Sequence, residues 1–334
     1  MATLPAHADR PQSSAVARAG SLLQRQGVLI ALVLIILFGT LRYDNFLSAY
    51  NVASVVRYNS MFGLIGLGMT FVIMTGGIDL SVGSVAALAS VIAALVSPYG
   101  LLPGLLVPLL AGALIGLLNG WIIARLGILP FIATLAMLLG ARGLALIFAK
   151  NTSVSVSYES GFTYLGQGNA FWLPVPAIIL IAAYLAGSLV LNYSRFGRHV
   201  LAIGGNEEAA RLMGLPVDRI KLAVYTLSGV LAALAGVILA SQFGAGQPTE
   251  GLGWELSAIA SVVVGGTLLT GGMGSVGATL VGVMLLGLIF NILNFENGRG
   301  LISLSAYWQS VIRGAFLLVV VILQNRLTRR RSNQ

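Results

Sequence analysis

Long apolar runs, separated by short polar segments, extend through most of the chain. A helix needs roughly 20 largely apolar residues to cross the hydrocarbon core of a bilayer. Ten segments meet this requirement and predict ten transmembrane helices, at 27–46, 60–77, 78–97, 102–125, 129–149, 170–193, 220–243, 255–273, 274–295 and 305–326. Only Gly-rich turns separate the second from the third and the eighth from the ninth. The predicted fold class is therefore all-α, a polytopic integral membrane protein.

The polar ends of the chain define its organisation. Residues 1–26 predict a flexible tail, residues 27–327 a single transmembrane domain, and residues 328–334 a short basic tail. The apolar run at 27–41 is similar to the core of a signal peptide, but no small-x-small cleavage site follows it. It is therefore predicted to be an uncleaved first span.

The positions of Lys and Arg predict the orientation in the membrane. With the N-terminus inside, 13 of the 19 basic residues fall on the inner side and four on the outer side, while Arg142 and Arg313 lie within spans. Basic residues concentrate in cytoplasmic loops. Both termini and the loop at 194–219 are therefore predicted to be cytoplasmic, and the polar stretch at 151–169 is predicted to lie outside.

Composition narrows the function classes. Apolar residues make up 57% of the chain and charged residues only 9%, against roughly 25% charged residues in soluble proteins. The net charge is +9, and the basic residues lie singly between apolar spans, apart from those at residues 326–331. Membrane lipid is therefore the expected partner of these cations, and nucleic acid is not. The absence of cysteine excludes thiolate metal sites, and with two histidines we expect no metal site.

The loop between the sixth and seventh spans predicts a short helix. Asn206 is a candidate N-cap, Glu207 and Glu208 suit the first turn, and Gly214 with Pro216 ends the helix. Such a short helix is not stable alone in water and must pack on something. Either it inserts into a groove of a partner protein or it lies against the membrane domain of its own chain. The sequence of the loop is compatible with both interpretations.

Several stretches resemble one known family. GGNEEAARLMG at 204–214 is similar to the cytoplasmic coupling loop of bacterial ABC importer permeases, with the motif at Glu208, Ala209, Ala210 and Gly214. Leu215 and Pro216 follow Gly214 at once, whereas the longer importer signature continues with an Ile-x-Leu-Pro well downstream. That departure, and the stretches at 75–84, 131–143, 202–214 and 259–279, resemble the sugar-permease branch of ribose, xylose and galactofuranose systems.

This resemblance implies a non-enzymatic permease subunit in the bacterial inner membrane that forms the pathway for a monosaccharide. The implied partners are a second permease subunit, identical or different, an ABC ATPase with two nucleotide-binding modules, and a periplasmic sugar-binding protein. No cofactor is expected, because the chain has no phosphate-binding loop and the partner would bind ATP. The residues implied to contact the ATPase are Gly205, Asn206, Glu207, Glu208, Ala209, Ala210, Arg211, Met213 and Gly214.

Charged residues within the membrane are the other candidates, because an ionisable group at that depth is costly. Arg142 lies well inside the fifth predicted span and is interpreted as a structural partner of a carboxylate or of free carbonyls, or as a donor to sugar hydroxyls. Arg313 lies nearer a span end and is expected to snorkel. Asp79, followed by Ser81, is interpreted as the N-cap of the third span at a tight cytoplasmic turn, or as part of the inner end of the pathway.

Two other function classes compete with an importer permease. A secondary transporter driven by an ion gradient uses acidic residues at broken helices, which Asp79 and its neighbouring glycines partly match. Such a protein would have no use for a loop that docks an ATPase. A membrane-embedded enzyme would need an acid–base or metal constellation that this chain lacks. The four tryptophans, near predicted span ends, are expected to form an interfacial belt.

Overall fold

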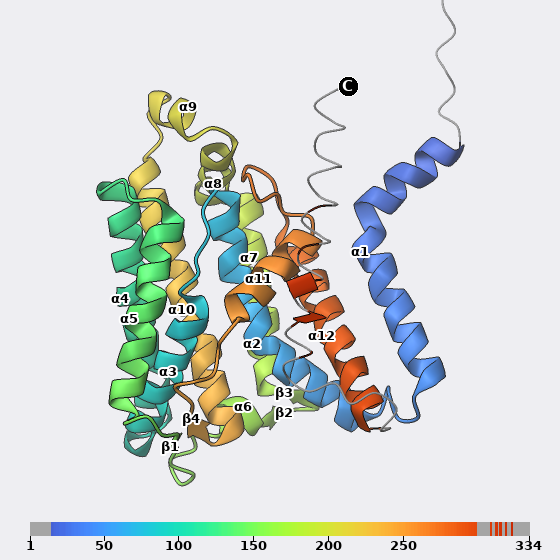
Figure 1. Ribbon diagram of the computed structural model, residues 1–334, viewed down its shortest axis with the longest axis vertical. Coiled ribbons are helices and arrows are strands. Elements are labelled where there is room, and N and C mark those ends of the chain that lie inside the picture. The colour runs from blue at the N-terminus through green and yellow to red at the C-terminus, as the bar shows by residue number, and fades with distance from the viewer. Residues whose placement is uncertain are drawn as a thin grey trace, which may run out of the picture.

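The computed structural model describes residues 15–298 and seven isolated positions between 308 and 322. Its helices form one bundle (Figure 1). The helices in chain order are α1 (Ala15–Arg42), α2 (Ala49–Met74), α3 (Val82–Val96), η1 (Ser97–Tyr99), α4 (Leu101–Arg125), α5 (Pro130–Phe148), α6 (Tyr164–Gln167), α7 (Val175–Tyr193), α8 (Arg195–Gly205), α9 (Glu207–Leu212), α10 (Val217–Phe243), α11 (Trp254–Val264) and α12 (Val276–Gly298).

Among the described residues, seven helical stretches are long and apolar enough to cross a membrane. They are α2, α3 with η1, α4, α5, α7, α10 and α12, and they correspond to the second to seventh and the ninth predicted spans. The apolar part of α1, Gly27–Arg42, is shorter. Most of the tenth predicted span, including Arg313, lies outside the described residues, as do the tail at 328–334 and the first 14 residues. The all-α class is confirmed, and the count of ten spans stays a prediction.

The eighth predicted span is wrong in its extent. Its helix, α11, has 11 residues, and at about 1.5 Å per residue it reaches about half of the roughly 30 Å hydrocarbon core. Gly266, Gly271 and Gly272 then adopt positive φ angles of 88°, 85° and 76°, which residues with a side chain rarely adopt. The glycines therefore end the helix, and the chain reaches α12 through a loop at 265–275.

Helix α2 occupies the centre of the bundle. Of its most apolar 18-residue window, 83% is buried, compared with 22% for α4 and for α5. Figure 1 shows α2 between α10 and α7 on one side and α12 on the other. Phe62 of α2 also stacks on Trp254, with ring centroids 4.8 Å apart. Trp254 is only 4% exposed, so it is a core residue and the expectation that it joins an interfacial belt is wrong.

Three glycines on one face of α4 allow it to pack closely against α10. Gly112, Gly116 and Gly120 recur every four residues on the face of α4 that meets α10. A Cβ added to Gly112 or Gly116 would meet the backbone carbonyl of Gly229 or Tyr225 at less than 3.0 Å. Helices in a membrane associate through such close backbone approach, since lipid provides little hydrophobic drive between them. These glycines therefore allow the backbones of α4 and α10 to pack closely together.

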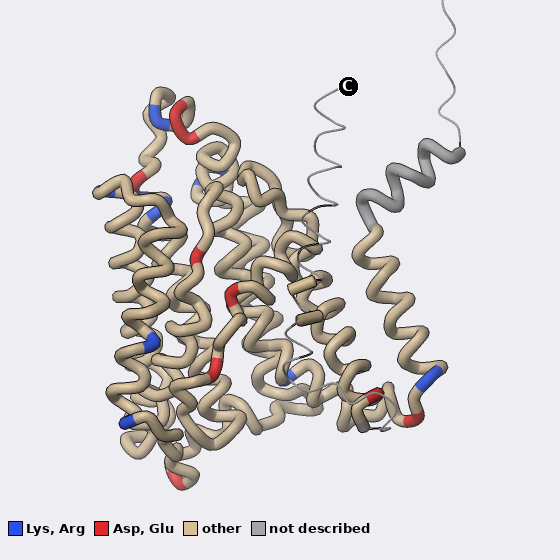
Figure 2. Tube along the Cα trace, in the orientation of Figure 1, with Lys and Arg blue, Asp and Glu red and all other residues tan. Residues whose placement is uncertain are grey.

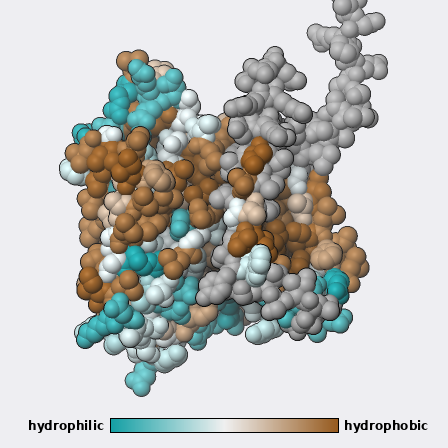
Figure 3. All heavy atoms as spheres, viewed as in Figure 1, coloured by the Kyte–Doolittle hydropathy of each residue, from teal (hydrophilic) through white to brown (hydrophobic). Residues whose placement is uncertain are grey.

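Polar connections lie at the two ends of the bundle. At one end, two short antiparallel pairs, β1 (Val154–Ser155) with β4 (Ala245–Gly246) and β2 (Asn169–Ala170) with β3 (Leu173–Pro174), close the loops near α6. Helices α8 and α9 lie at the opposite end (Figure 1). Charged residues lie at these ends and at a few positions between them (Figure 2), and apolar side chains cover the flank formed by α4 and α5 (Figure 3). The loop at 151–169 and the α8–α9 segment thus lie on opposite sides, as the predicted topology requires.

Candidate functional site

Helices α8 and α9 form a hairpin at one end of the bundle, and local capping defines both helices. The Ser194 hydroxyl accepts a hydrogen bond from the Gly197 amide at 3.1 Å and begins α8. The Asn206 side chain accepts one from the Ala209 amide at 2.9 Å and begins α9, so the predicted N-cap is confirmed. Gly214, with φ of 80°, follows the end of α9. The predicted short helix is therefore present within the α8–α9 hairpin.

Ion pairs hold α9 against the start of α10. The predicted pair of Glu207 and Arg211 is present at 3.4 Å. Lys221 contacts Glu207 at 2.6 Å, and Arg211 contacts Asp218 at 2.9 Å. The hydrogen bond to Asp218 is the main cause of a raised pKa of the Arg211 guanidinium. Exposed ion pairs contribute little stability individually, but this network orients α9 relative to α10.

One face of α9 packs on its own chain and the other is open. Ala210 is fully buried, while Leu212 and Met213 are 84% and 72% exposed. Glu208 is exposed beside them. The helix therefore lies against its own membrane domain and presents large apolar side chains outward, and insertion of that outer face into a partner protein stays a prediction.

Asp79 lies in a buried polar cluster in the extended segment 75–81 between α2 and α3. Its Oδ1 accepts hydrogen bonds from the amide and the hydroxyl of Ser81, at 3.0 and 2.6 Å. Its Oδ2 accepts one from the hydroxyl of Ser228 on α10, at 2.8 Å. Asn119 of α4 donates to the Ser81 hydroxyl at 3.0 Å. All four side chains are 1% exposed.

These contacts correct the N-cap prediction for Asp79. The N-cap position of α3 belongs to Ser81, and Asp79 binds that residue instead of the helix amides beyond it. The turn is also not tight, because seven residues separate α2 from α3 and they return into the bundle before α3 begins (Figure 1). Asp79 therefore links three elements, namely segment 75–81, α10 and, through Ser81, α4. Sequence reasoning missed Ser228 and Asn119.

Arg142 of α5 contacts backbone carbonyls and not a carboxylate. Its guanidinium donates to the carbonyl oxygens of Pro248 and Glu250, in the loop between β4 and α11. Carbonyl groups outside a helix need donors at membrane depth, and Arg142 supplies two. This arrangement matches the structural interpretation of Arg142, and it holds the 247–253 loop against α5.

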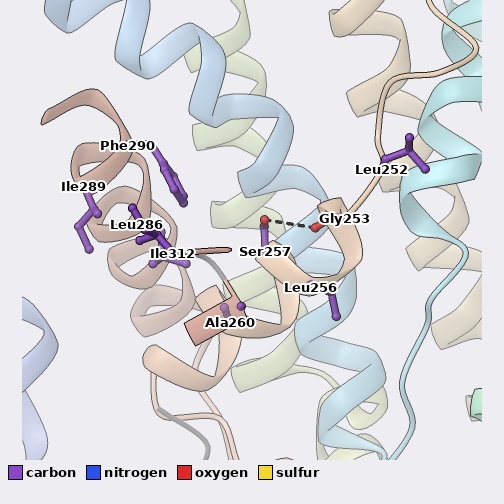
Figure 4. A pocket seen from close by; sticks show the side chains of 10 residues that line it. Leu252, Gly253, Leu256, Ser257, Ala260, Leu286, Ile289, Phe290 and Ile312 are labelled. Atoms are coloured by element: carbon purple, nitrogen blue, oxygen red, sulfur yellow. Dashed lines mark hydrogen bonds between the residues drawn. The ribbon is translucent and has the colours of Figure 1, made fainter. Parts of the chain in front are cut away.

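An apolar pocket lies between α11, α12 and the loop that precedes α11. Leu252, Leu256, Ala260, Leu286 and Phe290 line it, together with Ser257 (Figure 4). The Ser257 hydroxyl is directed to its own helix and donates to the Gly253 carbonyl at 3.3 Å. Sugar binding requires several free hydrogen-bonding groups, and this lining does not supply them. Across the described residues, moreover, no cluster of three or more His, Asp or Glu could hold a metal ion.

Comparison with known proteins assigns the family. Residues 51–321 match the model of the branched-chain amino acid transport system permease component. The chain belongs to this permease family. The permease is 39% identical over 307 residues to the ribose import permease protein RbsC of Bacillus subtilis, covering 91% of this chain and 94% of that protein. It is 40% identical over 307 residues to the L-arabinose transport system permease protein AraH of Escherichia coli, covering 91% of each.

These relatives support three of the predictions directly. The resemblance to importer permeases is confirmed, and a permease subunit is not an enzyme. The relatives and the seven apolar helices make this permease a multi-pass protein of the bacterial inner membrane. No solved structure matches the chain.

Proposed function

We propose that this permease forms the membrane pathway of an ATP-driven importer for a monosaccharide of the ribose, arabinose, xylose or galactofuranose class. The observation that carries this proposal is the similarity to ribose and L-arabinose permeases over 91% of the chain. Its partners would be a second permease subunit, identical or different, an ATPase with two nucleotide-binding modules, and a periplasmic sugar-binding protein. The ATPase would bind and hydrolyse ATP.

The α8–α9 hairpin is the proposed docking site for the ATPase. Leu212 and Met213 offer apolar area that their own chain leaves open, and Glu208 adds a charge beside them. Short amphipathic helices bind partner proteins by placing such side chains in a groove. The ion pairs of Glu207 and Arg211 with α10 fix the angle of the helix, so docking requires little reordering.

The membrane domain favours weak interaction with the sugar along the pathway. The described pocket is apolar, and Arg142 directs its Nη1 to two backbone carbonyls. Selectivity among the candidate sugars would therefore rest mainly with the sugar-binding protein. Uptake of labelled ribose, arabinose, xylose and galactose by cells that express the complete transporter would identify the substrate.

Leu212 provides a sharp test of docking, because it is 84% exposed and its replacement disturbs little within the chain. Leu212→Asp should leave the amount of inserted protein unchanged, release the ATPase on purification, and abolish uptake. Leu212→Met keeps the apolar area and should retain both properties. Replacement of Glu208 or a Gly214→Trp change should also abolish uptake without preventing insertion. Normal ATP-driven uptake by Leu212→Asp or Gly214→Trp would contradict the docking role.

The competing function is a secondary transporter that uses Asp79 at a broken segment to bind an ion. Reconstitution in liposomes separates the two. An importer moves sugar only with the ATPase and ATP, whereas sugar movement driven by an ion gradient in liposomes that contain the permease alone would overturn the proposed function.

A further inference from the structure

Three glycine-rich turns that are far apart in the sequence meet beneath the α8–α9 hairpin. They follow α2, end α8 and precede α12 (Figure 1). We name the residues at their contact the glycine junction, which consists of Gly76, Gly204, Gly205, Gly271 and Gly272.

The contacts in the glycine junction are made by backbone atoms. The Gly272 amide donates to the Met74 carbonyl, the last residue of α2, at 3.0 Å. A Cβ added to Gly271 would lie 2.8 Å from the Gly76 nitrogen and 3.0 Å from the Gly204 Cα. A Cβ on Gly204 would meet the Met74 carbonyl oxygen far inside van der Waals contact. Any side chain at these points would therefore push the three turns apart.

Backbone contact makes the glycine junction a stiff connection. The hairpin is also linked to the bundle by Val200 and Ile203 of α8, which are buried, and by the ion pairs from α9 to α10, in which Glu207 and Arg211 are 40% and 53% exposed. Packed backbones have no side-chain rotamers to absorb a displacement, and tightly packed interiors transmit strain. A displacement of the hairpin is therefore expected to reach the end of α2 through this backbone contact.

The glycine junction continues into the Asp79 cluster. Gly76 lies near the start of segment 75–81, and three to five residues later that segment is fixed by the bonds of Asp79 to Ser228 and of Ser81 to Asn119. The amides of Thr75, Gly76 and Gly77 still donate to carbonyls of α2, and beyond them residues 78–81 are not helical. Movement at the glycine junction must therefore shift the segment and, with it, the buried bonds that join α3, α4 and α10.

We propose that Gly204 is a positioning residue of the transport cycle, which passes movement of the docked hairpin through the glycine junction to segment 75–81 and its Asp79 cluster. This inference rests on the proposed function, because it takes an ATPase bound to the hairpin as the source of movement. It adds the route inside the membrane domain, and it explains why glycines from three separate segments are brought into contact at one point.

Gly204→Ala tests the inference in the complete transporter, reconstituted with its ATPase and sugar-binding protein. Alanine favours a helix more than glycine does, so α8 itself is not weakened, and the open face of α9 is unchanged. The variant should keep its ATPase bound, while the sugar moved per ATP hydrolysed falls by about tenfold, which lies within the usual range of coupling between sites. Gly277→Ala is the control, because Gly277 lies at the start of α12 and a Cβ there meets nothing within 4 Å.

Ser228→Ala provides a second measurement, since it removes the bond to Asp79 and adds no atom, and it should also lower the ratio of sugar to ATP. An unchanged ratio in Gly204→Ala would overturn the inference, as would loss of the bound ATPase, which would mean a docking defect. Should Gly204→Ala not fold, an unchanged ratio in Ser228→Ala alone would overturn it. Failure of the proposed function has a different result, because the unaltered permease would then bind no ATPase.

Discussion

Replacing Asp79 tests whether its carboxylate holds three elements together. Asp79→Ala leaves three buried donors, the amide and hydroxyl of Ser81 and the hydroxyl of Ser228, without their acceptor. Each unsatisfied buried group costs about 1–3 kcal/mol, so the expected loss is about 3–6 kcal/mol after partial relaxation. That is a large part of a typical total stability of about 5–15 kcal/mol.

Asp79→Asn should behave differently, because an amide oxygen still accepts from Ser81 and the Ser228 hydroxyl can turn to accept from the amide nitrogen. Removal of a buried charge also offsets part of the lost bond strength, so the loss should stay within about 2 kcal/mol. The assay is the temperature at which half of the purified protein in detergent aggregates, with exposed Asp44→Ala as the control. At roughly 2 °C per kcal/mol, Asp79→Ala should lose about 6–12 °C. An Asp79→Ala protein as stable as Asp79→Asn would refute the reasoning.

Three further changes follow from contacts described above. Gly116→Ala should destabilise the permease by about 1–3 kcal/mol through overpacking against α10, whereas Gly140→Ala, where a Cβ meets nothing within 4 Å, should be neutral or stabilising in the same aggregation assay. Lys221→Met should change stability by less than about 1 kcal/mol but speed amide hydrogen exchange in α9, and unchanged exchange would contradict the ion-pair argument. Arg142→Met should lower the stability of the permease by about 1–3 kcal/mol, because it leaves two carbonyls without a donor. An aggregation temperature equal to that of the unaltered permease would contradict this expectation.

Seven of the spans were predictable because the requirement for a long apolar run is local. The extent of α11 was not, because the residues from 265 to 273 carry no charge and include Leu268, Leu269 and Met273, and the helix ends through the positive φ angles of Gly266, Gly271 and Gly272. Repeated glycines in that stretch were a visible sign, but glycines are also common in membrane helices that pack closely. Sequence alone does not separate these two uses.

The candidate sites also contain some features that local sequence predicts and some contacts that it does not. The N-cap of Asn206 and the pair of Glu207 with Arg211 were predictable, since both depend on spacings of three or four residues within one helix. The contact of Glu207 with Lys221 depends on the angle between α9 and α10, and that of Asp79 with Ser228 joins residues 149 positions apart. Such contacts arise from the packing of whole helices, which no local pattern specifies.

The central position of α2 has a consequence for the assembly of the protein in the membrane. As an early helix, α2 enters the bilayer before α7, α10 and α12, which later enclose it, have been synthesised. It also has the lowest hydropathy of the seven spanning helices, 1.2. Asn59, Ser60 and Thr70 donate to carbonyls of their own helix four residues earlier, so each side chain has a hydrogen-bond partner before any neighbour arrives. These hydrogen bonds within α2 lower the cost of exposing its polar side chains to lipid until the later helices enclose it.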